Sequence, residues 1–248
     1  MKKISVLLFL IGSLGLTYCK KDSTTTSNSG ATSSSSSLTP PSTLTIGSNI
    51  SCNGFLVLTT VSGADSNIAM PVTTAAYFTN TPTKNIEPSS FTKVSSVALN
   101  GDVFKFYSYD YADSIQLFTQ GPTYWSVTGL NGIPSFTYFN NDASPKYKGF
   151  YSLTDSINRN LNLMIPLSSI TGADTGQVTV SDGTHYVSKV FSGTTGFIIF
   201  SATDLSLLGT ASHGQLSVLC TNNNIQTFGG KKFDFSTSAY FYKNVVIK

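Results

Sequence analysis

Histidines, acidic residues and aromatic residues are the side chains of this sequence that could catalyse a reaction or bind a ligand. The histidines are considered first. His185 and His213 are the two histidines of the chain, and Asp182 lies three residues before His185. A serine close to such a pair would complete the nucleophile, base and orienting carboxylate of a hydrolase. A chain this rich in serine offers such combinations by chance, and each histidine follows a turn where it can be a polar surface group. The sequence therefore assigns no catalytic residue.

Acidic residues that could act in pairs are few. Asp110 and Asp113 are the closest pair in sequence, and Glu87 is the one glutamate. Carboxyl groups about 5 Å or about 6.5–9.5 Å apart hydrolyse glycosidic bonds, but a strand would place these two aspartates on opposite sides. The run from Asn140 to Asp142 carries oxygen ligands suited to calcium, yet it lacks EF-hand spacing and is typical of a turn. We therefore predict no metal site and no cofactor.

Aromatic residues give the best indication of a ligand. Tyr107, Tyr109 and Tyr111 alternate along a predicted strand, which places them on one face, opposite the phenylalanines of the same run. Exposed tyrosines in a row can stack on the apolar faces of sugars, although cross-strand packing uses the same residues. Trp125, the single tryptophan, could join this platform, but a lone tryptophan in a strand more often fills a core. These four residues are the candidate ligand-binding residues.

Charge excludes one class of partner. The chain has 15 basic and 12 acidic residues and a net charge of +3, and only 11% of its residues are charged. Nucleic-acid binding requires clustered basic residues. The largest basic pair in the region expected to fold, Lys231-Lys232, is typical of a solvated strand end. We therefore expect no nucleic-acid partner, and serine, threonine and asparagine supply most of the polarity.

The elements that must position these side chains are predicted to be short strands. Valine, isoleucine, threonine, tyrosine and phenylalanine are plentiful, whereas strong helix formers are scarce. Strands are predicted at Phe55–Val61, Thr74–Phe78, Val94–Leu99, Val103–Tyr109, Ile115–Phe118, Tyr124–Val127, Phe136–Phe139, Leu161–Pro166, Gln177–Val180, Tyr186–Phe191, Gly196–Phe200, Gln215–Leu219, Lys232–Phe235 and Ala239–Ile247. Asn100-Gly101 and Asp182-Gly183 predict tight turns, and residues 201–209 predict one short helix. This pattern indicates an all-β sandwich.

Composition also predicts the domain organisation. Residues 23–43 are rich in serine and threonine and cannot bury enough apolar surface to fold, so we expect a disordered tether. The region after it suits two domains of about 100 residues or one large sandwich. We predict sandwich domains at 44–150 and 151–248. Cys52 and Cys220 then fall in different domains and are expected to be buried thiols, with a disulfide as the alternative.

The first residues resemble a bacterial lipoprotein signal peptide. Lys2 and Lys3 precede an apolar run, 4–16, that is too short to span a membrane of about 30 Å and has the length of a signal-peptide core. Cys19 follows where lipoproteins carry the lipidated cysteine, with Tyr18 in place of the usual small residue. Acyl chains there would anchor the protein, because each buried methylene contributes about 0.8 kcal/mol. The alternative is an ordinary secretory signal cleaved elsewhere.

This resemblance implies a location. Residues 1–18 would be the signal peptide, and 19–43 would be the lipidated cysteine with its linker. The short cluster Lys20-Lys21-Asp22 resembles the surface-export tag of some Gram-negative lipoproteins. We therefore expect the protein at the outer membrane, held by the lipid on Cys19 and facing the cell surface if that tag operates.

The carboxyl-terminal half resembles immunoglobulin-like modules of Gram-negative surface lipoproteins. The resemblance rests on Gly196–Leu205, Gln215–Val218 and Gly229–Phe235, covers roughly residues 155–248, and lacks the Cys…Trp…Cys core of antibody domains. It implies an immunoglobulin-like β-sandwich and an envelope location, with no activity attached. The leading hypothesis is a non-enzymatic, lipid-anchored protein that binds a glycan or an envelope protein or has a structural role. The alternative is a secreted hydrolase with its site on sandwich loops.

Overall fold

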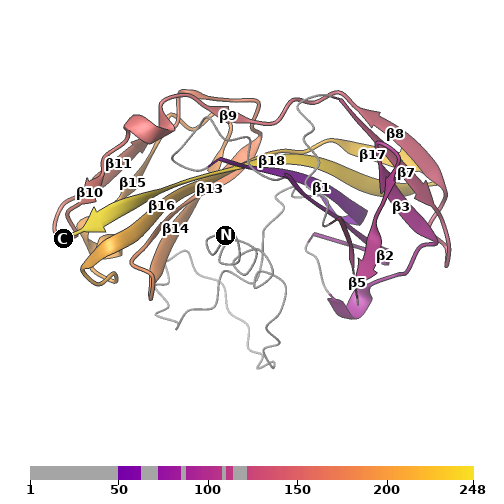
Figure 1. Cartoon of the computed structure of the whole chain (residues 1–248), viewed down its shortest axis with the longest axis horizontal. Helices are drawn as coiled ribbons and strands as arrows, with labels where there is room; N and C mark the ends of the chain where they lie inside the picture. The colour runs from indigo at the N-terminus through magenta and orange to yellow at the C-terminus, as the bar shows by residue number, and fades with distance from the viewer. Residues whose placement is uncertain (1–49, 63–71, 85–87, 108–109, 114–121) are drawn as a thin grey trace, which may run out of the picture.

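The computed structural model describes residues 50–62, 72–84, 88–107, 110–113 and 122–248. The molecule is an arch whose two halves are joined by one long strand, β18 (Lys231–Ile247) (Figure 1). Helical structure among the described residues is limited to α2 (Ala202–Leu205) and two single turns, η2 (Pro88–Ser90) and η3 (Phe150–Ser152). The all-β expectation is confirmed.

One large sheet runs through both halves of the arch. Its strand order is β14-β13-β16-β18-β1-β2-β6-β5, with β10 and β17 paired to β18 beside this path. The strands other than β18 are β1 (Cys52–Ser62), β2 (Val72–Thr83), β5 (Lys105–Tyr107), β6 (Asp110–Asp113), β10 (Ser156–Ile157), β13 (Thr175–Ser181), β14 (Tyr186–Ser192), β16 (Ala211–Asn222) and β17 (Ile225–Phe228). β18 pairs with β1 in parallel through residues 233–241 and with β16 in antiparallel through residues 237–247. Each end of β18 thus belongs to a different half.

Smaller sheets form the outer layer of the arch (Figure 1). The amino-terminal half has a four-stranded sheet of order β4-β3-β7-β8, and the other half has two-stranded sheets β11-β15 and β12-β9. These strands are β3 (Ser96–Leu99), β4 (Asp102–Val103), β7 (Thr123–Thr128), β8 (Phe136–Asn140), β9 (Lys146–Tyr147), β11 (Leu163–Pro166), β12 (Ile170–Thr171) and β15 (Phe197–Phe200). The arrangement is sandwich-like, with the large sheet on the inner side.

Two hydrophobic cores lie between these layers, and β18 contributes to both. The amino-terminal core consists of Leu56, Leu58, Ala76, Phe78, Val94, Val97, Leu99, Phe104, Tyr111, Trp125, Val127, Ile133, Phe136, Phe233 and Phe235. The carboxyl-terminal core includes Phe150, Ile165, Val178, Val180, Phe200, Leu205, Leu216, Val218, Cys220, Ala239, Phe241, Val245 and Ile247. Odd-numbered residues of β18 face the cores, so its even-numbered residues face the inside of the arch.

The prediction of two separate strands at Lys232–Phe235 and Ala239–Ile247 is wrong. Residues 236–238, which lie between the two predicted strands, continue β18 without interruption. β1 pairs with all three of these residues on one side, and β16 pairs with Thr237 and Ser238 on the other, so the strand continues here although the side chains are polar. The predicted domains 44–150 and 151–248 share this strand, and their independence stays a prediction.

Local signals predicted the short helix within residues 201–209 and the turn at Asn100-Gly101, although the helix ends at Leu205 and its cap is Ser201 instead of a threonine or an aspartate. Ser201 caps α2, since its hydroxyl accepts a hydrogen bond from the Asp204 N–H (3.1 Å) and its own N–H donates to Asp204 Oδ2 (2.8 Å). Asn100 and Gly101 both have positive φ, 51° and 94°, in the tight turn that joins β3 to β4. The predicted strand 115–118 lies outside the described residues.

Cys52 and Cys220 are both buried and do not form a disulfide, as expected. Burial raises the pKa of the Cys220 thiol to about 12. This thiol therefore stays protonated and unreactive at neutral pH, and it packs as part of the carboxyl-terminal core.

The predicted signal peptide, Cys19 and the linker to residue 43 lie outside the described residues. Within the part of the chain that the structure describes, no helix is long and apolar enough to cross a membrane.

Candidate functional site

Trp125 fills a core and is not accessible to a ligand. Its side chain is 1% exposed and meets Phe104 edge to face, with ring centroids 5.7 Å apart. The preference of a lone tryptophan for the core is confirmed, and its candidacy as a sugar platform is wrong.

The predicted tyrosine row is broken by a change of chain direction. Residues 103–109 do not form one strand, because β5 turns back into β6 and pairs Phe106 with Tyr111. Tyr111 is 3% exposed, and its hydroxyl accepts from the Val94 N–H (3.1 Å) and donates to the Val94 carbonyl. Tyr107 is 48% exposed on the other face of the hairpin, and Tyr109 lies outside the described residues. The structure therefore does not bring Tyr107 and Tyr111 into one exposed row.

Asp142 behaves as a turn residue, whereas Asp110 begins β6 and is a partly buried strand residue whose pKa is raised by burial. The Asp142 N–H donates to Asn140 Oδ1 (3.0 Å), and Asp142 Oδ2 accepts from the Asn224 side chain (2.6 Å). The side chain of Asp113 lies outside the described residues. Across the described ranges, no three histidine, cysteine or acidic side chains gather as metal ligands would.

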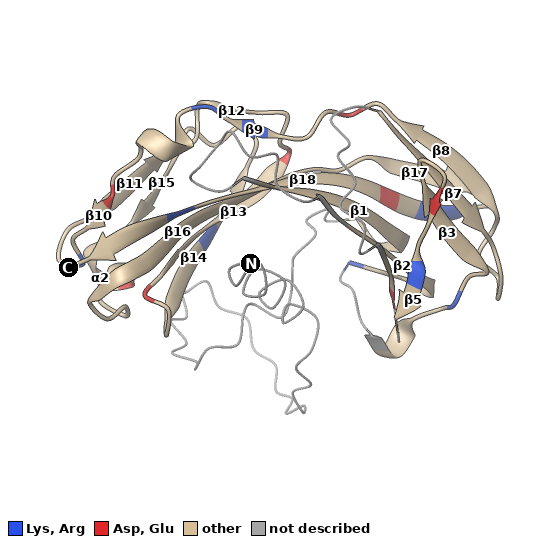
Figure 2. Ribbon diagram, viewed as in Figure 1, with Lys and Arg blue, Asp and Glu red and all other residues tan. Residues whose placement is uncertain are grey.

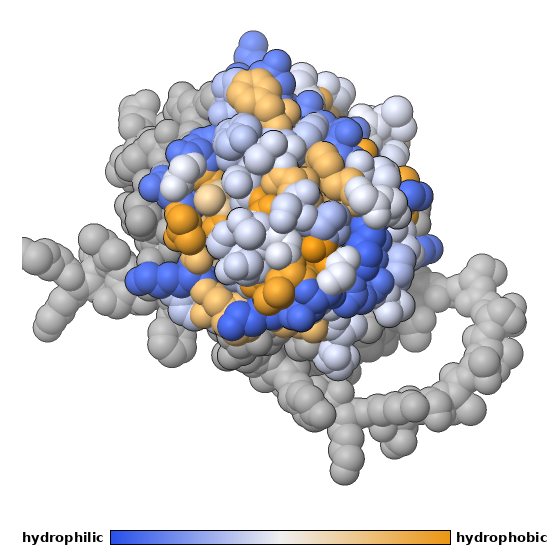
Figure 3. Space-filling view, turned by 90° about the vertical axis from the view of Figure 1, so that its right-hand side faces the viewer, coloured by the Kyte–Doolittle hydropathy of each residue, from blue (hydrophilic) through white to orange (hydrophobic). Residues whose placement is uncertain are grey.

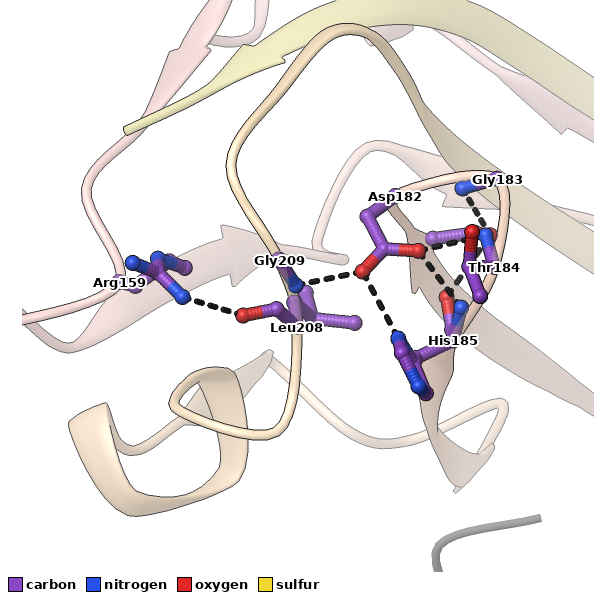
Figure 4. Close-up of polar contacts among 8 residues, drawn as sticks. Arg159, Asp182, Gly183, Thr184, His185, Leu208 and Gly209 are labelled. Carbon is purple, nitrogen blue, oxygen red and sulfur yellow. Dashed lines mark hydrogen bonds and ion pairs between the residues drawn. The ribbon is translucent and has the colours of Figure 1, made fainter. Parts of the chain in front are cut away.

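Asp182 and His185 do come together, at the turn between β13 and β14 (Figure 4). The Asp182 side chain is 4% exposed and accepts from the backbone N–H groups of Thr184 (2.6 Å), His185 (2.6 Å) and Gly209 (2.5 Å), and it also contacts His185 Nδ1 (3.1 Å). Burial alone would raise the pKa of this carboxyl, but these hydrogen bonds outweigh it and lower the pKa to about 2. Asp182 thus stays ionised and ties the hairpin to the loop after α2.

A hydrolytic triad needs a serine at the imidazole, and the nearest serine in sequence is used elsewhere. Ser181 donates its hydroxyl to the His185 carbonyl (2.9 Å) and accepts from the Gly183 N–H (3.1 Å). His213 lies exposed near the start of β16. The arrangement around Asp182 is therefore explained by its structural role in the turn.

A shallow depression of about 300 Å³ lies beside β10 and β11. It is lined by Leu153, Thr154, Ser156, Ile157, Asn158, Leu161, Asn162, Leu163, Met164 and Ile165. None of these side chains titrates, so the depression holds no acid, base or nucleophile with a shifted pKa.

The inner face of the large sheet carries the arrangement best suited to a ligand. In the carboxyl-terminal half, cross-strand pairing aligns Ser188, Thr179, Ser217 and Tyr242 in one row over β14, β13, β16 and β18. The adjacent row on the same four strands contains Tyr186, Ser181, Gln215 and Asn244. Side chains directly opposite on neighbouring strands share a face, so these uncharged polar residues line one side of the sheet. Ser217 is buried there, and the other seven are partly or fully exposed.

We call this surface the inner polar face. It consists of Thr175, Gln177, Thr179, Ser181, Tyr186, Ser188, Gln215, Ser217, Thr221, Ser238, Tyr240, Tyr242 and Asn244, with Val190 and Leu219 among them. Ser217, Thr221 and Ser238 are buried, so the other residues are the ones that a ligand could contact. No member is a carboxylate, an amine or a guanidinium. Lys189 and Lys243, on the same strands, lie on the opposite side of the sheet and contact Asp204 (2.7 Å) and Asp155 (2.5 Å). Figure 2 shows how few charged residues the sheet carries.

Two tyrosines lie at the centre of the arch on this face. The rings of Tyr240 and Tyr242 are stacked, with centroids 5.8 Å apart and an interplanar angle of 25°. The Tyr240 hydroxyl donates to Gln215 Oε1 (3.4 Å), and burial raises the pKa of this phenol. Both side chains are only partly buried, so a neutral aromatic pair borders the rows of hydroxyls and amides.

Sequence reasoning missed this face although its signal was present. The alternation of polar and apolar residues in Thr175–Ser181 places valines in the core and Thr175, Gln177, Thr179 and Ser181 on the other face. A polar alternate face is typical of any solvated strand. Only the register of four strands shows that these residues align with Tyr240 and Tyr242.

Exposed apolar pairs occur on the outer sheets. Tyr124 and Phe139 are cross-strand partners on β7 and β8, and both are exposed. Figure 3 shows this end of the molecule, where apolar residues are scattered among polar ones. On the other half, Met164 pairs with Ile199 and both are exposed. These pairs are smaller and less organised than the inner polar face.

Comparison of the chain with protein-family models, with curated proteins and with solved structures gave no match.

Proposed function

We propose that this chain is a non-enzymatic, lipid-anchored envelope protein that binds neutral glycans on its inner polar face. The observation that carries the proposal is the uncharged ladder of hydroxyls and amides across four strands beside the stacked Tyr240 and Tyr242.

The chemistry of the face matches that of an uncharged sugar chain. Serine and threonine hydroxyls and the glutamine and asparagine amides both donate and accept hydrogen bonds, as sugar hydroxyls do. Strands about 4.8 Å apart repeat these groups at regular intervals across the face. Tyrosine rings offer apolar surface for a sugar ring and a hydroxyl at its edge. A ligand with carboxylates or sulfates would find no lysine or arginine side chain on this face, so we expect neutral glycans to be preferred.

The cellular location of the protein is part of the same proposal. A lipid on Cys19 would hold the protein at the outer membrane, and residues 23–43 would act as a flexible spacer. The two layered halves would be immunoglobulin-like sandwich domains, as the resemblance of residues 155–248 suggests. Replacing Cys19 with serine should release the protein from the membrane fraction and abolish labelling by a fatty-acid analogue. Unchanged labelling and retention would contradict the lipid anchor without bearing on glycan binding.

The glycan site is tested with neutral oligosaccharides of known structure. We expect isothermal titration calorimetry to detect binding to at least one of a set of hexasaccharides with glucan, mannan, xylan or chitin linkages. Tyr242→Ala should weaken that binding at least fivefold, about 1 kcal/mol, because it removes both ring surface and a hydroxyl. Tyr124→Ala removes an exposed tyrosine from the outer sheet and should leave affinity unchanged. No binding by the wild type, or equal loss in both variants, would refute the inner polar face as the site.

A second candidate function is contact with an envelope protein. It is favoured by the exposed Met164 and Ile199 pair on β11 and β15, beside which Phe197 is also exposed. A lone exposed apolar cluster marks protein contacts more often than sugar contacts. Crosslinking in intact cells, with Met164→Asp as the variant, would show a partner that depends on this cluster. Loss of the crosslink with retained glycan binding would assign the two surfaces separate roles.

A further inference from the structure

A buried carboxylate without a hydrogen-bond partner lies near the start of β18. Asp234 is 0% exposed, and neither of its carboxylate oxygens makes a hydrogen bond to another residue that the structure describes. Its cross-strand neighbours are Phe55 on β1 and Ile225 on β17, so apolar side chains flank it. Burying an ionised carboxylate is costly unless another group compensates its charge.

A second carboxylate and two neutral oxygens lie in the same neighbourhood. Asp174, just before β13, accepts from the Asn223 N–H through Oδ2 (2.9 Å), and Asn223 Oδ1 accepts from the Ser236 hydroxyl (3.3 Å). Ser236 is two residues from Asp234 on the same face of β18. Three separate segments therefore bring Asp234, Ser236, Asn223 and Asp174 into one chain of neighbours.

Electrostatics connects the two carboxylates. Burial raises the pKa of Asp234 to about 6, and the negative charge of Asp174 contributes in the same direction. The Ser236 hydroxyl and the Asn224 N–H act the other way, close enough to influence the charge but outside hydrogen-bonding geometry. The two acids thus repel each other in a region where water does not reach Asp234.

No basic side chain neutralises this pair among the described residues. The ion pairs of the described chain join His185 to Asp182, Lys189 to Asp204 and Lys243 to Asp155. The Nζ of Lys231, a nearby lysine on β18, donates to Asn80 Oδ1 (2.6 Å). Within the described ranges, the charge of Asp234 and Asp174 therefore has no basic side chain as counter-ion.

We propose that a calcium ion binds among Asp234, Asp174, Asn223 and Ser236. Calcium takes six to eight oxygen ligands at about 2.3–2.6 Å from carboxylates, amide carbonyls, hydroxyls and water, in flexible geometry. The four side chains offer only oxygen ligands, with no imidazole or thiolate, which favours a hard cation over zinc or copper. The ion would supply the missing partner of Asp234. It would also tie β18 to the β16–β17 turn and to the start of β13, at one end of the inner polar face.

The test is calcium binding by the mature protein after treatment with a chelator. Calorimetric titration with calcium chloride at pH 7.5 should show one site in the wild type. The melting temperature should rise by about 3–5 °C when calcium is tenfold above its Kd. Asp234→Asn, which keeps the shape and removes the charge, should lose both responses at least tenfold. Asp102→Asn, at the distant β3–β4 turn, should keep them.

Two outcomes would overturn the calcium site. One is a wild type that takes up no calcium at millimolar concentration, which would leave Asp234 as a buried neutral acid. The other is an Asp234→Asn variant that binds calcium as the wild type does, which would place the ion elsewhere. Circular dichroism of both variants verifies that they fold. Because Asp234 is not on the glycan rows, either result leaves the test of Tyr242 unaffected.

Discussion

The two halves of the molecule share one sheet but differ in how they fill it. The amino-terminal core is dominated by rings, among them Phe78, Phe104, Trp125, Phe136, Phe233 and Phe235. The carboxyl-terminal core is mainly aliphatic along its central strands, with Val178, Val180, Leu216 and Val218. The ring-filled half closes over short outer strands through contacts such as Phe136 on Phe228, stacked at 4.5 Å and 9°. Large rings thus supply contact area where strands are short.

The inner faces differ as well. In the amino-terminal half the inner side of the sheet carries Phe55, Val57 and Tyr77, which form a small apolar cluster with Cys52. In the carboxyl-terminal half it carries the uncharged rows that end at Tyr242. On its inner side, one sheet therefore carries buried apolar side chains at one end and uncharged polar side chains at the other, and only the second set matches a neutral sugar chain.

We expect the largest loss of stability from substitutions in β18, and these substitutions test whether the two halves fold together. Phe235→Ala and Phe241→Ala remove one ring from each core and should each cost about 3–5 kcal/mol. Trp125 is buried in the amino-terminal core, so its fluorescence reports on that half. Because both rings belong to β18, we expect Phe241→Ala to lower the urea midpoint of Trp125 fluorescence along with that of the circular-dichroism signal.

The opposite result would show that the two halves unfold independently. If Phe241→Ala leaves the Trp125 transition in place while the circular-dichroism transition splits, the halves are independent domains. Phe235→Ala is the matched variant, since it should lower the Trp125 transition in either case.

A smaller effect is expected at the turn of the carboxyl-terminal half. Asp182→Ala removes a carboxylate bound by three backbone N–H groups and should cost about 1–2 kcal/mol at pH 7. The folded pKa, about 2, lies below the unfolded value near 4. The stabilisation is therefore complete above about pH 4 and is lost as the pH falls through about 2. Urea denaturation of both proteins at several pH values should show their difference shrinking towards pH 2. A difference independent of pH would show that the charge of Asp182 is not the cause.

The smallest effect separates the two tyrosines of the amino-terminal hairpin. Tyr111→Phe leaves the buried Val94 N–H and carbonyl without the hydroxyl and should cost about 1 kcal/mol. Tyr107→Ala changes an exposed side chain and should alter stability by less than about 0.5 kcal/mol. Thermal melts of the two variants measure this contrast. Equal losses would mean that Tyr107 is packed in solution.

The accuracy of sequence reasoning also differs between the halves. The sequence predicted strands at Gln177–Val180 and Tyr186–Phe191, and β13 and β14 include both of these ranges. The prediction from alternation failed at residues 103–111. The tyrosines there were assumed to lie along one continuous strand, whereas a hairpin reverses the chain. The identities of Phe106 and Tyr111 do not by themselves indicate that these residues are cross-strand partners. Their contact depends on the turn between them.

The candidate site also depended on strand pairing that the sequence does not reveal. The tyrosines chosen from sequence were those nearest to one another along one segment, whereas the stacked pair with aligned polar neighbours is on β18. Tyr240 and Tyr242 are as visible in the sequence as Tyr107 and Tyr111. Their partners Gln215 and Ser217 come from a strand more than twenty residues earlier, and no local pattern states that register.

The sequence was sufficient to predict the strand character of the chain, its tight turns and its one short helix, because these follow from the preferences of neighbouring residues. Tertiary structure alone decided that residues 236–238 join two halves, that four strands align their polar faces, and that Asp234 is buried without a partner. These features depend on which distant segments become neighbours. That choice is made by packing and backbone pairing over the whole sheet.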